Sequence, residues 1–390
     1  MIEITPIEDA AAWDALLQRW SRPHVLQSWL WGACKAQTGW HATRWRIGPD
    51  DRPLAAVAML RRRLGRLPFA VAYVPKGPTL DWSDAAAVDA ALSSIERAAR
   101  RQGALFVKID PDVPTDAAYA SSVQETLRAR GWRPSSEQIQ FRNTVLIDLV
   151  DEEETLLGRM KPKWRYNIRL AGRRGVQVRA GGPGDLATFY ALYAETSARD
   201  GFLIRPYAYY QTIWETFLGA GQGHLLLAAA EGQTIAGIFL LRFGPTAWYF
   251  YGASGAQGRN LMPNHLLQWE AMRWARAQGC TVYDLWGAPD TLSEQDPLWG
   301  VYHFKEGFGG RFTAWLGAWD YAVTRAGYWL YTTMMPRLLD LLRRRRFAYR
   351  RRRFAYRRRR FAYRRRQGVS SQTPAIHANS CAAVVRSSSS

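Results

Sequence analysis

The sequence has few cysteines and no long apolar run. Its three cysteines, Cys34, Cys280 and Cys381, are widely spaced and follow no metal-ligand pattern. This indicates a reducing compartment and argues against a disulfide framework or a zinc site. No uninterrupted apolar run reaches the roughly 20 residues of a membrane-spanning helix, and the opening MIEITPIEDA lacks the layout of a signal peptide. We therefore expect a cytoplasmic protein without a metal or an organic cofactor.

The rest of the composition is typical of a globular protein. The 390 residues are 47% apolar and include 18 tryptophans, enough for two ordinary domains with real cores. The net charge is unevenly distributed, because sixteen arginines and no acidic residue follow Leu342. Subtracting 16 from the net charge of +20 leaves +4 for residues 1–342. The globular part is therefore only mildly basic.

The C-terminal region combines an apolar helix with a repeated basic motif. The pattern predicts an aromatic helix from Tyr321 to Met335, ended by Pro336. RRRRFAY then occurs three times between Arg343 and Tyr363, and a Ser-rich end that we expect to be disordered follows. The repeat could hold anionic lipid headgroups at the inner membrane face, could bind RNA nonspecifically, or could be a neutral expansion.

One order of predicted elements occurs twice, about 180 residues apart. Asp50–Leu60 and Glu231–Leu241 each combine an acidic turn with an apolar strand. Further on, a helix ending at Gly103 and another ending at Gly279 each precede a buried strand. A chance match of common elements is the alternative. The shared order instead favours duplicated α/β domains with mixed sheets.

The stretch from Tyr283 to Gly310 is the strongest candidate for a site. Apolar residues predict a buried strand that ends at Gly287, and a second apolar run, Val301–Phe304, leads to Lys305. Aromatic residues and glycines flank this lysine. That setting favours a positive charge held in a shielded site, where charge interactions are stronger than in water. The alternative is a lysine whose stem lies along an edge strand.

A basic segment lies between the two predicted repeats. Residues 159–179 contain eight Lys or Arg and no acid, interleaved with Trp164 and Tyr166. We expect a helix from Lys163 that ends at Gly172. Such a segment suits an anionic backbone such as RNA phosphate or pyrophosphate. A solvated charged helix face is the alternative.

Two further cations occur close to aromatic residues. Trp31 and Lys35 are four residues apart on a predicted helix, so they share a face. Arg205 precedes Pro206 and is followed four residues later by Tyr209. An arginine beside tyrosines fits phosphate or carboxylate recognition. Packing of the lysine stem and a structural ion pair are the respective alternatives.

Seven stretches together resemble the FemABX family of peptidoglycan aminoacyltransferases. The resemblance spans roughly residues 20–320, in the family's order. The stretches read VLQSWLWGACK, AYVPKGPTLDW, MKPKWRYNIRLAGRRGV, RDGFLIRP, YGASG, YDLWGAPD and YHFKEGFGG. The resemblance implies an enzyme that moves an amino acid from aminoacyl-tRNA to an amino group of the stem peptide of a peptidoglycan precursor, on lipid II or its nucleotide precursor.

The resemblance also implies a fold. We expect two tandem GNAT-like acyltransferase domains, a C-terminal helix and a basic tail. Domain 1 is predicted at residues 1–147, completed by 311–342. Domain 2 is predicted at 148–310, and the repeats with the disordered end at 343–390. We expect a monomer.

Site residues follow from the resemblance position by position. Lys35 and Arg205 are similar to the basic residues that hold the precursor's phosphates, and Tyr209 and Tyr251 to the tyrosines that line that channel. The remaining expected residues are Trp31 beside the precursor, Phe304 and Lys305 beside the reacting ester, Asp110 near the acceptor amine, and Lys161, Lys163, Arg165 and Arg169 on tRNA.

The sequence departs from the family pattern in places. Leu105 and Leu203 stand where some members carry polar groups, so precursor contacts can differ. The segment from Gly172 to Gly175 lacks the long helical arm of some staphylococcal members. Where an acetyl-CoA enzyme needs a glycine-rich pyrophosphate loop, this chain reads AQGRNLMPN, which disfavours that donor.

The donor suggests the mechanism. An aminoacyl ester is already activated, so an amine only has to lose a proton and attack. Lys305 is the candidate that stabilises the oxyanion, worth ~3 kcal/mol for one good donor. Asp110 is the candidate base, although a strand-end aspartate more often forms a turn. A substrate phosphate that accepts the proton is the alternative. The competing hypotheses are an N-acyltransferase with another donor, acting on a lipid or exopolysaccharide precursor, and a non-catalytic membrane- or RNA-binding protein.

Overall fold

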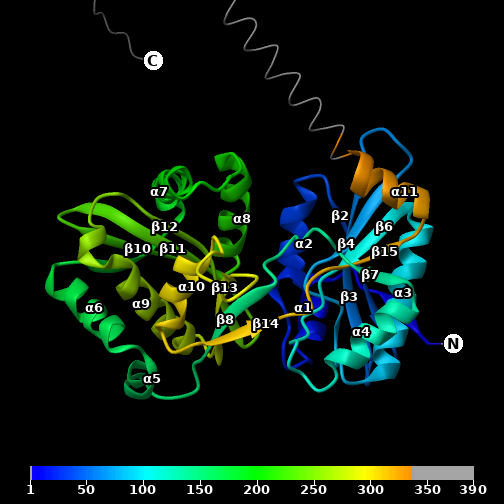
Figure 1. Cartoon of the computed structure of the whole chain (residues 1–390), viewed down its shortest axis with the longest axis horizontal. Coiled ribbons are helices and arrows are strands. Elements are labelled where there is room, and N and C mark those ends of the chain that lie inside the picture. The colour runs from blue at the N-terminus through cyan, green and yellow to red at the C-terminus, as the bar shows by residue number, and fades with distance from the viewer. Residues whose placement is uncertain (1, 336, 338–390) are drawn as a thin grey trace, which may run out of the picture. The chain divides into compact units, whose positions relative to one another are not determined.

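The computed structural model describes residues 2–335 and 337, so the predicted basic repeats and Ser-rich end lie outside the described residues. Two mixed sheets organise residues 2–328 (Figure 1). The first sheet has the order β1-β2-β3-β4-β6-β15-β7, with β5 paired to β3. The second has the order β14-β8-β13-β12-β11-β10-β9.

The strands of the first sheet are β1 (Ile4–Pro6), β2 (His41–Ile47), β3 (Ala55–Arg63), β4 (Ala70–Val74), β5 (Thr79–Leu80), β6 (Ala104–Ile109), β7 (Trp132–Pro134) and β15 (Trp319–Ala322). Those of the second are β8 (Asn143–Asp148), β9 (Gln177–Gly181), β10 (Gly223–Ala230), β11 (Gln233–Phe243), β12 (Thr246–Ser254), β13 (Val282–Ala288) and β14 (Arg311–Ala314).

The helices are α1 (Ala10–Leu17), α2 (Trp29–Ala36), α3 (Ala85–Arg101), α4 (Ala120–Ala129), α5 (Glu153–Arg159), α6 (Pro162–Arg173), α7 (Leu186–Asp200), α8 (Tyr207–Gly219), α9 (Pro263–Ala277), α10 (Trp299–Glu306) and α11 (Arg325–Trp329). A π-helical turn, η4 (Leu330–Met334), follows α11, and short 3₁₀ turns occur at Val25–Gln27, Pro183–Asp185 and Arg259–Leu261. Among the described residues, no helix combines the length and the apolar character needed to cross a bilayer.

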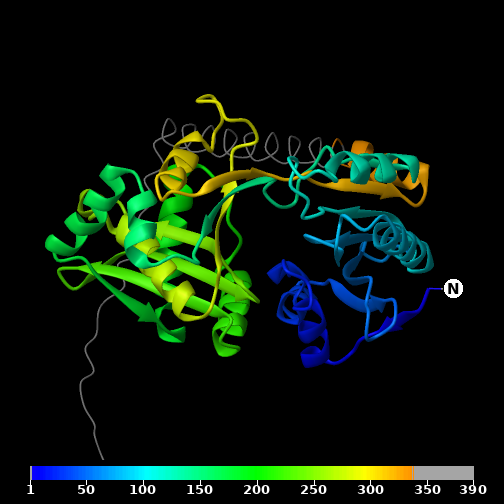
Figure 2. The same ribbon diagram turned by 90° about the horizontal axis from the view of Figure 1, so that it is seen from below.

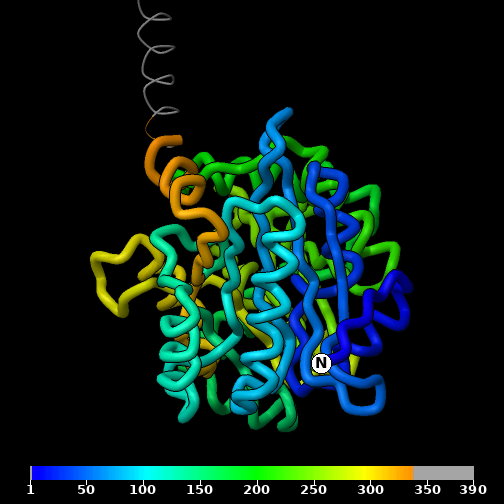
Figure 3. The backbone as a smooth tube through the Cα atoms, turned by 90° about the vertical axis from the view of Figure 1, so that its right-hand side faces the viewer, coloured from blue at the N-terminus to red at the C-terminus, as the bar shows by residue number. Residues whose placement is uncertain are grey.

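The duplication predicted from the sequence is confirmed. The order β2-β3-β4-α3-β6 in the first half matches β10-β11-β12-α9-β13 in the second. In each, antiparallel strands lead to one that pairs in parallel with the strand after the helix, β4 with β6 and β12 with β13. Figure 3 shows α3 and α4 in front of the first sheet.

Near the boundary of the two sheets, strands that are close in the sequence belong to different sheets. β8 and β14 pair with each other in the second sheet, whereas β15, a few residues after β14, lies between β6 and β7 of the first (Figure 2). Residues 311–342, which were expected to complete domain 1, therefore contribute β14 to the second sheet and β15 to the first. The predicted domain limits remain a prediction.

The helix predicted from Tyr321 to Met335 is wrong at its start. Tyr321 and Ala322 belong to β15, where they pair with Val107 and Phe106 of β6. The helix begins only at Arg325. The long-range pairing outweighs the helical spacing of the aromatic residues.

Each sheet has its own core, and a third cluster joins the halves. That cluster packs Trp13 and Trp31 from the first half against Phe189, Trp214 and Trp286 from the second. The aromatic side chains therefore bring α2 and α8 together, and this contact positions the candidate site.

Candidate functional site

Lys305 lies inside the second half rather than on its surface. It is 5% exposed, on α10, so the alternative of a lysine lying along an edge strand is wrong. Its Nζ donates hydrogen bonds to the carbonyl oxygens of Trp286 at 3.1 Å and Gly287 at 2.6 Å. Burial lowers the pKa of Lys305 to about 7, against the opposing effect of Asp284. Both protonation states of this lysine are therefore accessible near neutral pH.

The ammonium of Lys305 occupies a gap between two diverging strands. β12 and β13 pair only from Thr246 to Trp248 and from Val282 to Asp284. Beyond this point β12 continues along β11, and β13 along β8. Nζ lies 5.7 Å from the centre of the Tyr249 ring on β12 and bonds to carbonyls of β13. The backbone thus sets both the position and the acceptors of the lysine.

Asp284 fixes the turn that supplies those carbonyls, and the sequence analysis missed it. Its Oδ1 accepts hydrogen bonds from the Thr144 hydroxyl and, at 2.7 Å, from the Trp286 backbone N–H. Trp286 has a φ of 57°, which costs a non-glycine residue energy and needs such support. Burial raises the pKa of Asp284. The only sequence signal was one acid within an apolar strand.

The structure brings together four of the predicted precursor-binding residues. Lys35 Nζ lies 2.8 Å from the Tyr209 hydroxyl and 4.4 Å from the Trp31 ring centre. The Arg205 guanidinium lies 4.9 Å from the Tyr209 ring centre. Two cations from different halves thus flank one tyrosine, an arrangement suited to a phosphate or a carboxylate.

A row of contacting aromatic rings connects this cluster to the Lys305 turn. The Trp31 and Phe250 ring centres are 5.8 Å apart, and Phe250 stacks on Trp286 at 4.8 Å. The predicted channel residue Tyr251 follows Phe250 and packs edge-on against Trp214 at 5.7 Å. Because Trp286 is the residue whose carbonyl accepts from Lys305, the two lysines belong to one packed unit.

Asp110 lies in the first half and does not bond to Lys305. It is 3% exposed, and its oxygens accept hydrogen bonds from the Tyr73 hydroxyl at 2.7 Å and from the Lys76 backbone N–H. Burial raises the pKa of Asp110 to about 6. The Tyr73 hydroxyl in turn accepts from Gln140 Nε2 at 3.2 Å. These hydrogen bonds form a chain from the Asp110 carboxylate to Gln140, which shortly precedes β8 of the second sheet.

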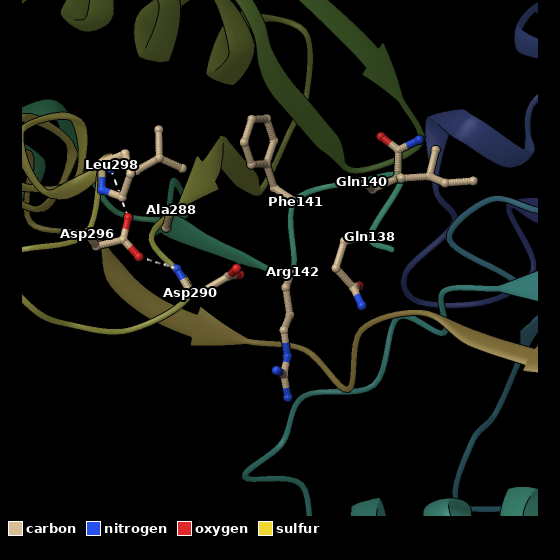
Figure 4. A pocket seen from close by; sticks show the side chains of 10 residues that line it. Gln138, Gln140, Phe141, Arg142, Ala288, Asp290, Asp296 and Leu298 are labelled. Carbon is tan, nitrogen blue, oxygen red and sulfur yellow. Dashed lines mark hydrogen bonds between the residues drawn. The ribbon is translucent and has the colours of Figure 1, made fainter. Parts of the chain in front are cut away.

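A pocket of about 320 Å³ adjoins both the hydrogen-bond chain of Asp110 and the turn that holds Lys305 (Figure 4). Gln140, on one wall, bonds to Tyr73, and Ala288 follows the carbonyl that holds Lys305. The Asp296 carboxylate accepts from the backbone N–H groups of Asp290 and Leu298 at 3.1 and 2.8 Å. The full lining is Gln138, Ile139, Gln140, Phe141, Arg142, Ala288, Asp290, Asp296, Pro297 and Leu298.

Phe304, the predicted neighbour of the reacting ester, makes a structural contact. Its carbonyl accepts from Trp164 Nε1 at 2.8 Å, and its ring packs edge-on against Phe308 at 5.1 Å. Trp164 is on α6, so the basic helix and α10 are joined beside Lys305.

The predicted tRNA-binding residues, Lys161 at the N-cap of α6 and the other three on the helix, divide into two kinds. Lys161 pairs with Glu306, and Arg165 Nη1 donates to carbonyls near the end of α5, including Met160 O at 2.6 Å. Lys163 and Arg169 are exposed and make no ion pair within 4 Å in the described part of the chain. Residues 159–179 contain no acid, but three of their cations pair with acids outside the segment: Arg159 with Asp151, Lys161 with Glu306 and Arg179 with Asp185.

Comparisons with known proteins agree with this architecture. The model of the FemAB family matches residues 10–234 and 228–335. The chain is 25% identical to a lipid II:glycine glycyltransferase of Staphylococcus aureus strain USA300, over 83% of this chain and 94% of that protein.

Solved structures give the same relationship. The crystal structure of FemX has a TM-score of 0.76 at 25% identity, covering 85% of this chain and 99% of that one. A tandem GNAT protein from the clavulanic acid biosynthesis pathway has a TM-score of 0.51 at 12% identity and covers 83% and 99%, which shows the fold alone. The chain belongs to the FemAB family and is built from two tandem GNAT-like units.

Proposed function

We propose that this chain is an aminoacyltransferase that moves an amino acid from aminoacyl-tRNA to the side-chain amine of the stem peptide of a peptidoglycan precursor. The likeness to a lipid II:glycine glycyltransferase over 94% of that protein's length supports the acceptor class. One observation carries the chemistry: a buried lysine ammonium is held on two carbonyls between diverging strands.

In this proposal, Lys305 acts on the ester. The amine nitrogen attacks the ester carbonyl, and negative charge develops on its oxygen. Two N–H groups of Lys305 are held by Trp286 and Gly287, so the third is directed to that oxyanion. As the carbon–oxygen bond to the ribose breaks, the leaving oxygen takes a proton. An ammonium with a pKa of about 7 is a suitable donor.

Asp110 is proposed to receive the proton that the amine loses. Burial raises its pKa to about 6, so it is a carboxylate at neutral pH but a stronger base than an exposed aspartate. The Tyr73 hydroxyl, bonded to Asp110 and to Gln140, is the group through which the proton would pass.

The substrates are assigned to two surfaces. Lys35 and Arg205 with Trp31, Tyr209 and Tyr251 would hold the phosphates of the precursor. The exposed cations Lys163 and Arg169, with Arg165 on the same helix and Lys161 at its N-cap, would face the tRNA backbone. The enzyme would act in the cytoplasm or at the inner membrane face, as a monomer and without a cofactor.

The test is product formation. Purified protein is incubated with a charged tRNA pool and labelled lipid II or nucleotide precursor, and the product is analysed by mass spectrometry. We expect addition of an amino acid to the precursor, abolished by ribonuclease. Activity that survives ribonuclease would instead support an N-acyltransferase with another donor. No product from either precursor would contradict the proposal.

A further inference from the structure

A second cavity lies in the first half, where β4 and β6 end. Its volume is about 340 Å³. It is lined by Arg19, Trp20, Ser21, Arg22, Lys76, Pro78, Thr79, Leu80, Asp81, Trp82, Asp112 and Tyr119. Lys76 follows β4 by two residues and has a φ of 46°, so a strained backbone places it there. Nothing in the transfer mechanism uses this cavity.

The Lys76 ammonium is buried without hydrogen-bond acceptors. Its side chain is 4% exposed. Within residues 2–335, its Nζ makes no hydrogen bond, and its nearest acidic oxygen is Asp112 Oδ1 at 4.0 Å. The Trp315 ring centre lies 5.3 Å away. An ammonium carries three donors, so these donors are available in the cavity that Lys76 lines.

The other nearby carboxylates are already engaged. The positive charge of Lys76 lowers the pKa of both Asp110 and Asp284, against the larger effect of burial. The Asp110 oxygens accept from Tyr73 and from the backbone N–H of Lys76 itself, and Asp284 accepts at its own turn. The side-chain donors of Lys76 therefore remain available to a ligand.

Arg22 provides a second cation at the same place. Its guanidinium lies 4.7 Å from the Trp315 ring centre and 3.7 Å from Asp112 Oδ2. Two cations thus lie against one indole, and Asp112 is the carboxylate within 4 Å of both. Arg19 differs, because its guanidinium donates to the carbonyls of Asp50 and Asp51 at 2.5 and 2.7 Å.

We propose that this cavity binds an oxyanion, a carboxylate or a phosphate group, through Lys76 and Arg22. The anion supplies the acceptors that the Lys76 ammonium lacks, and the Arg22 guanidinium adds a charge-assisted contact. The Trp315 indole contacts both cations and helps to hold them in place. The proposal does not depend on the transfer reaction, because the proposed mechanism gives no role to Lys76 or Arg22.

The test is calorimetric titration of the full chain at low salt with three probes: N-acetyl-alanine, its neutral amide, and methyl phosphate. We expect at least one anion to bind and the amide not to bind. Lys76→Met should weaken anion binding about tenfold or more, since hydrogen bonds to charged groups are worth roughly 1.5–3 kcal/mol. Arg22→Gln should weaken it a few-fold. The remote control Arg128→Gln should bind as the wild type does.

The outcomes separate the sources of the anion. Binding of N-acetyl-alanine alone assigns the site to a peptide or amino-acid carboxylate, and binding of methyl phosphate to a phosphate group. If neither anion binds, or if both variants bind as tightly as the wild type, the proposal is overturned. Arg22 has a half-exposed side chain, so Arg22→Gln decides the matter if Lys76→Met fails to fold.

Discussion

The two halves of the molecule share a topology but end their central parallel strands differently. In the first half, β4 and β6 stay paired up to Val74 and Ile109. Asp110 then closes this end through bonds to Tyr73 and Lys76. In the second half, pairing stops at Trp248 and Asp284, and both strands continue apart.

The open end in the second half admits a side chain from a later helix. Lys305 enters between β12 and β13 and is held by backbone carbonyls, whereas Lys76 beside the closed end lacks such acceptors. The buried lysines Lys305 and Lys76 therefore lie near the ends of corresponding strand pairs but in different environments.

The largest expected effect comes from removing the ammonium of Lys305, the buried lysine of the second half. Lys305→Met should lower kcat/KM for transfer by about 10²–10³, because one preorganised oxyanion donor is lost. Val301→Ala, on the exposed side of the same helix, should stay within about twofold. Steady-state kinetics with matched circular dichroism spectra check this. A folded Lys305→Met protein with near-normal activity would break the comparison.

A smaller effect is expected from removing the negative charge of Asp284, which acts on Lys305. Asp284→Asn keeps an oxygen acceptor for the Trp286 N–H but removes the charge that raises the pKa of Lys305. We expect about a tenfold loss of kcat/KM at neutral pH, roughly one pKa unit, and an alkaline limb of the pH–rate profile displaced to lower pH. Glu294→Gln, on a nearby exposed loop, should not displace it. An unmoved limb in Asp284→Asn would mean that the carboxylate acts only structurally.

The cluster between the halves should affect binding more than turnover. Lys35→Met removes one of the two cations beside Tyr209, so KM for the precursor should rise about tenfold with kcat nearly unchanged. Tyr209→Phe removes only the hydroxyl and should have a smaller effect. A fall in kcat with unchanged KM would place Lys35 in the chemical step instead.

The smallest effect is expected on α6. Replacing Lys163 and Arg169 together by Gln should flatten the salt dependence of tRNA binding by roughly one to two units of log–log slope. Lys161→Gln should change it less, because Lys161 is paired with Glu306. Filter binding over a salt series measures both. Equal slopes for all proteins would remove α6 from the tRNA surface.

Local patterns predicted most of the fold but not the contacts within the site. The repeated order of strands and helices, with glycines after the helices, was sufficient for the two-fold architecture. The apolar run before Lys305 was too short to distinguish a strand from a helix. Its helical form emerges only when α10 packs beside β13.

Long-range partners explain the remaining misses. The partner of Lys161 is 145 residues away, and Tyr321 joins β15 because β6 offers a free edge. The support of Trp286 by Asp284 and Thr144 joins strands far apart in the chain. No propensity within a single segment contains such pairings, so neither Asp284 nor Lys76 could be assigned from the sequence.

The most direct test of the account is the pH dependence of kcat/KM for aminoacyl transfer. Activity should rise through a pH of about 6 as Asp110 loses its proton and fall above about 7 as Lys305 loses its own. In Lys305→Arg, which cannot deprotonate in this range, a lower activity should persist without the alkaline fall. The same alkaline limb in both proteins would contradict the assignment of Lys305 to the reacting ester.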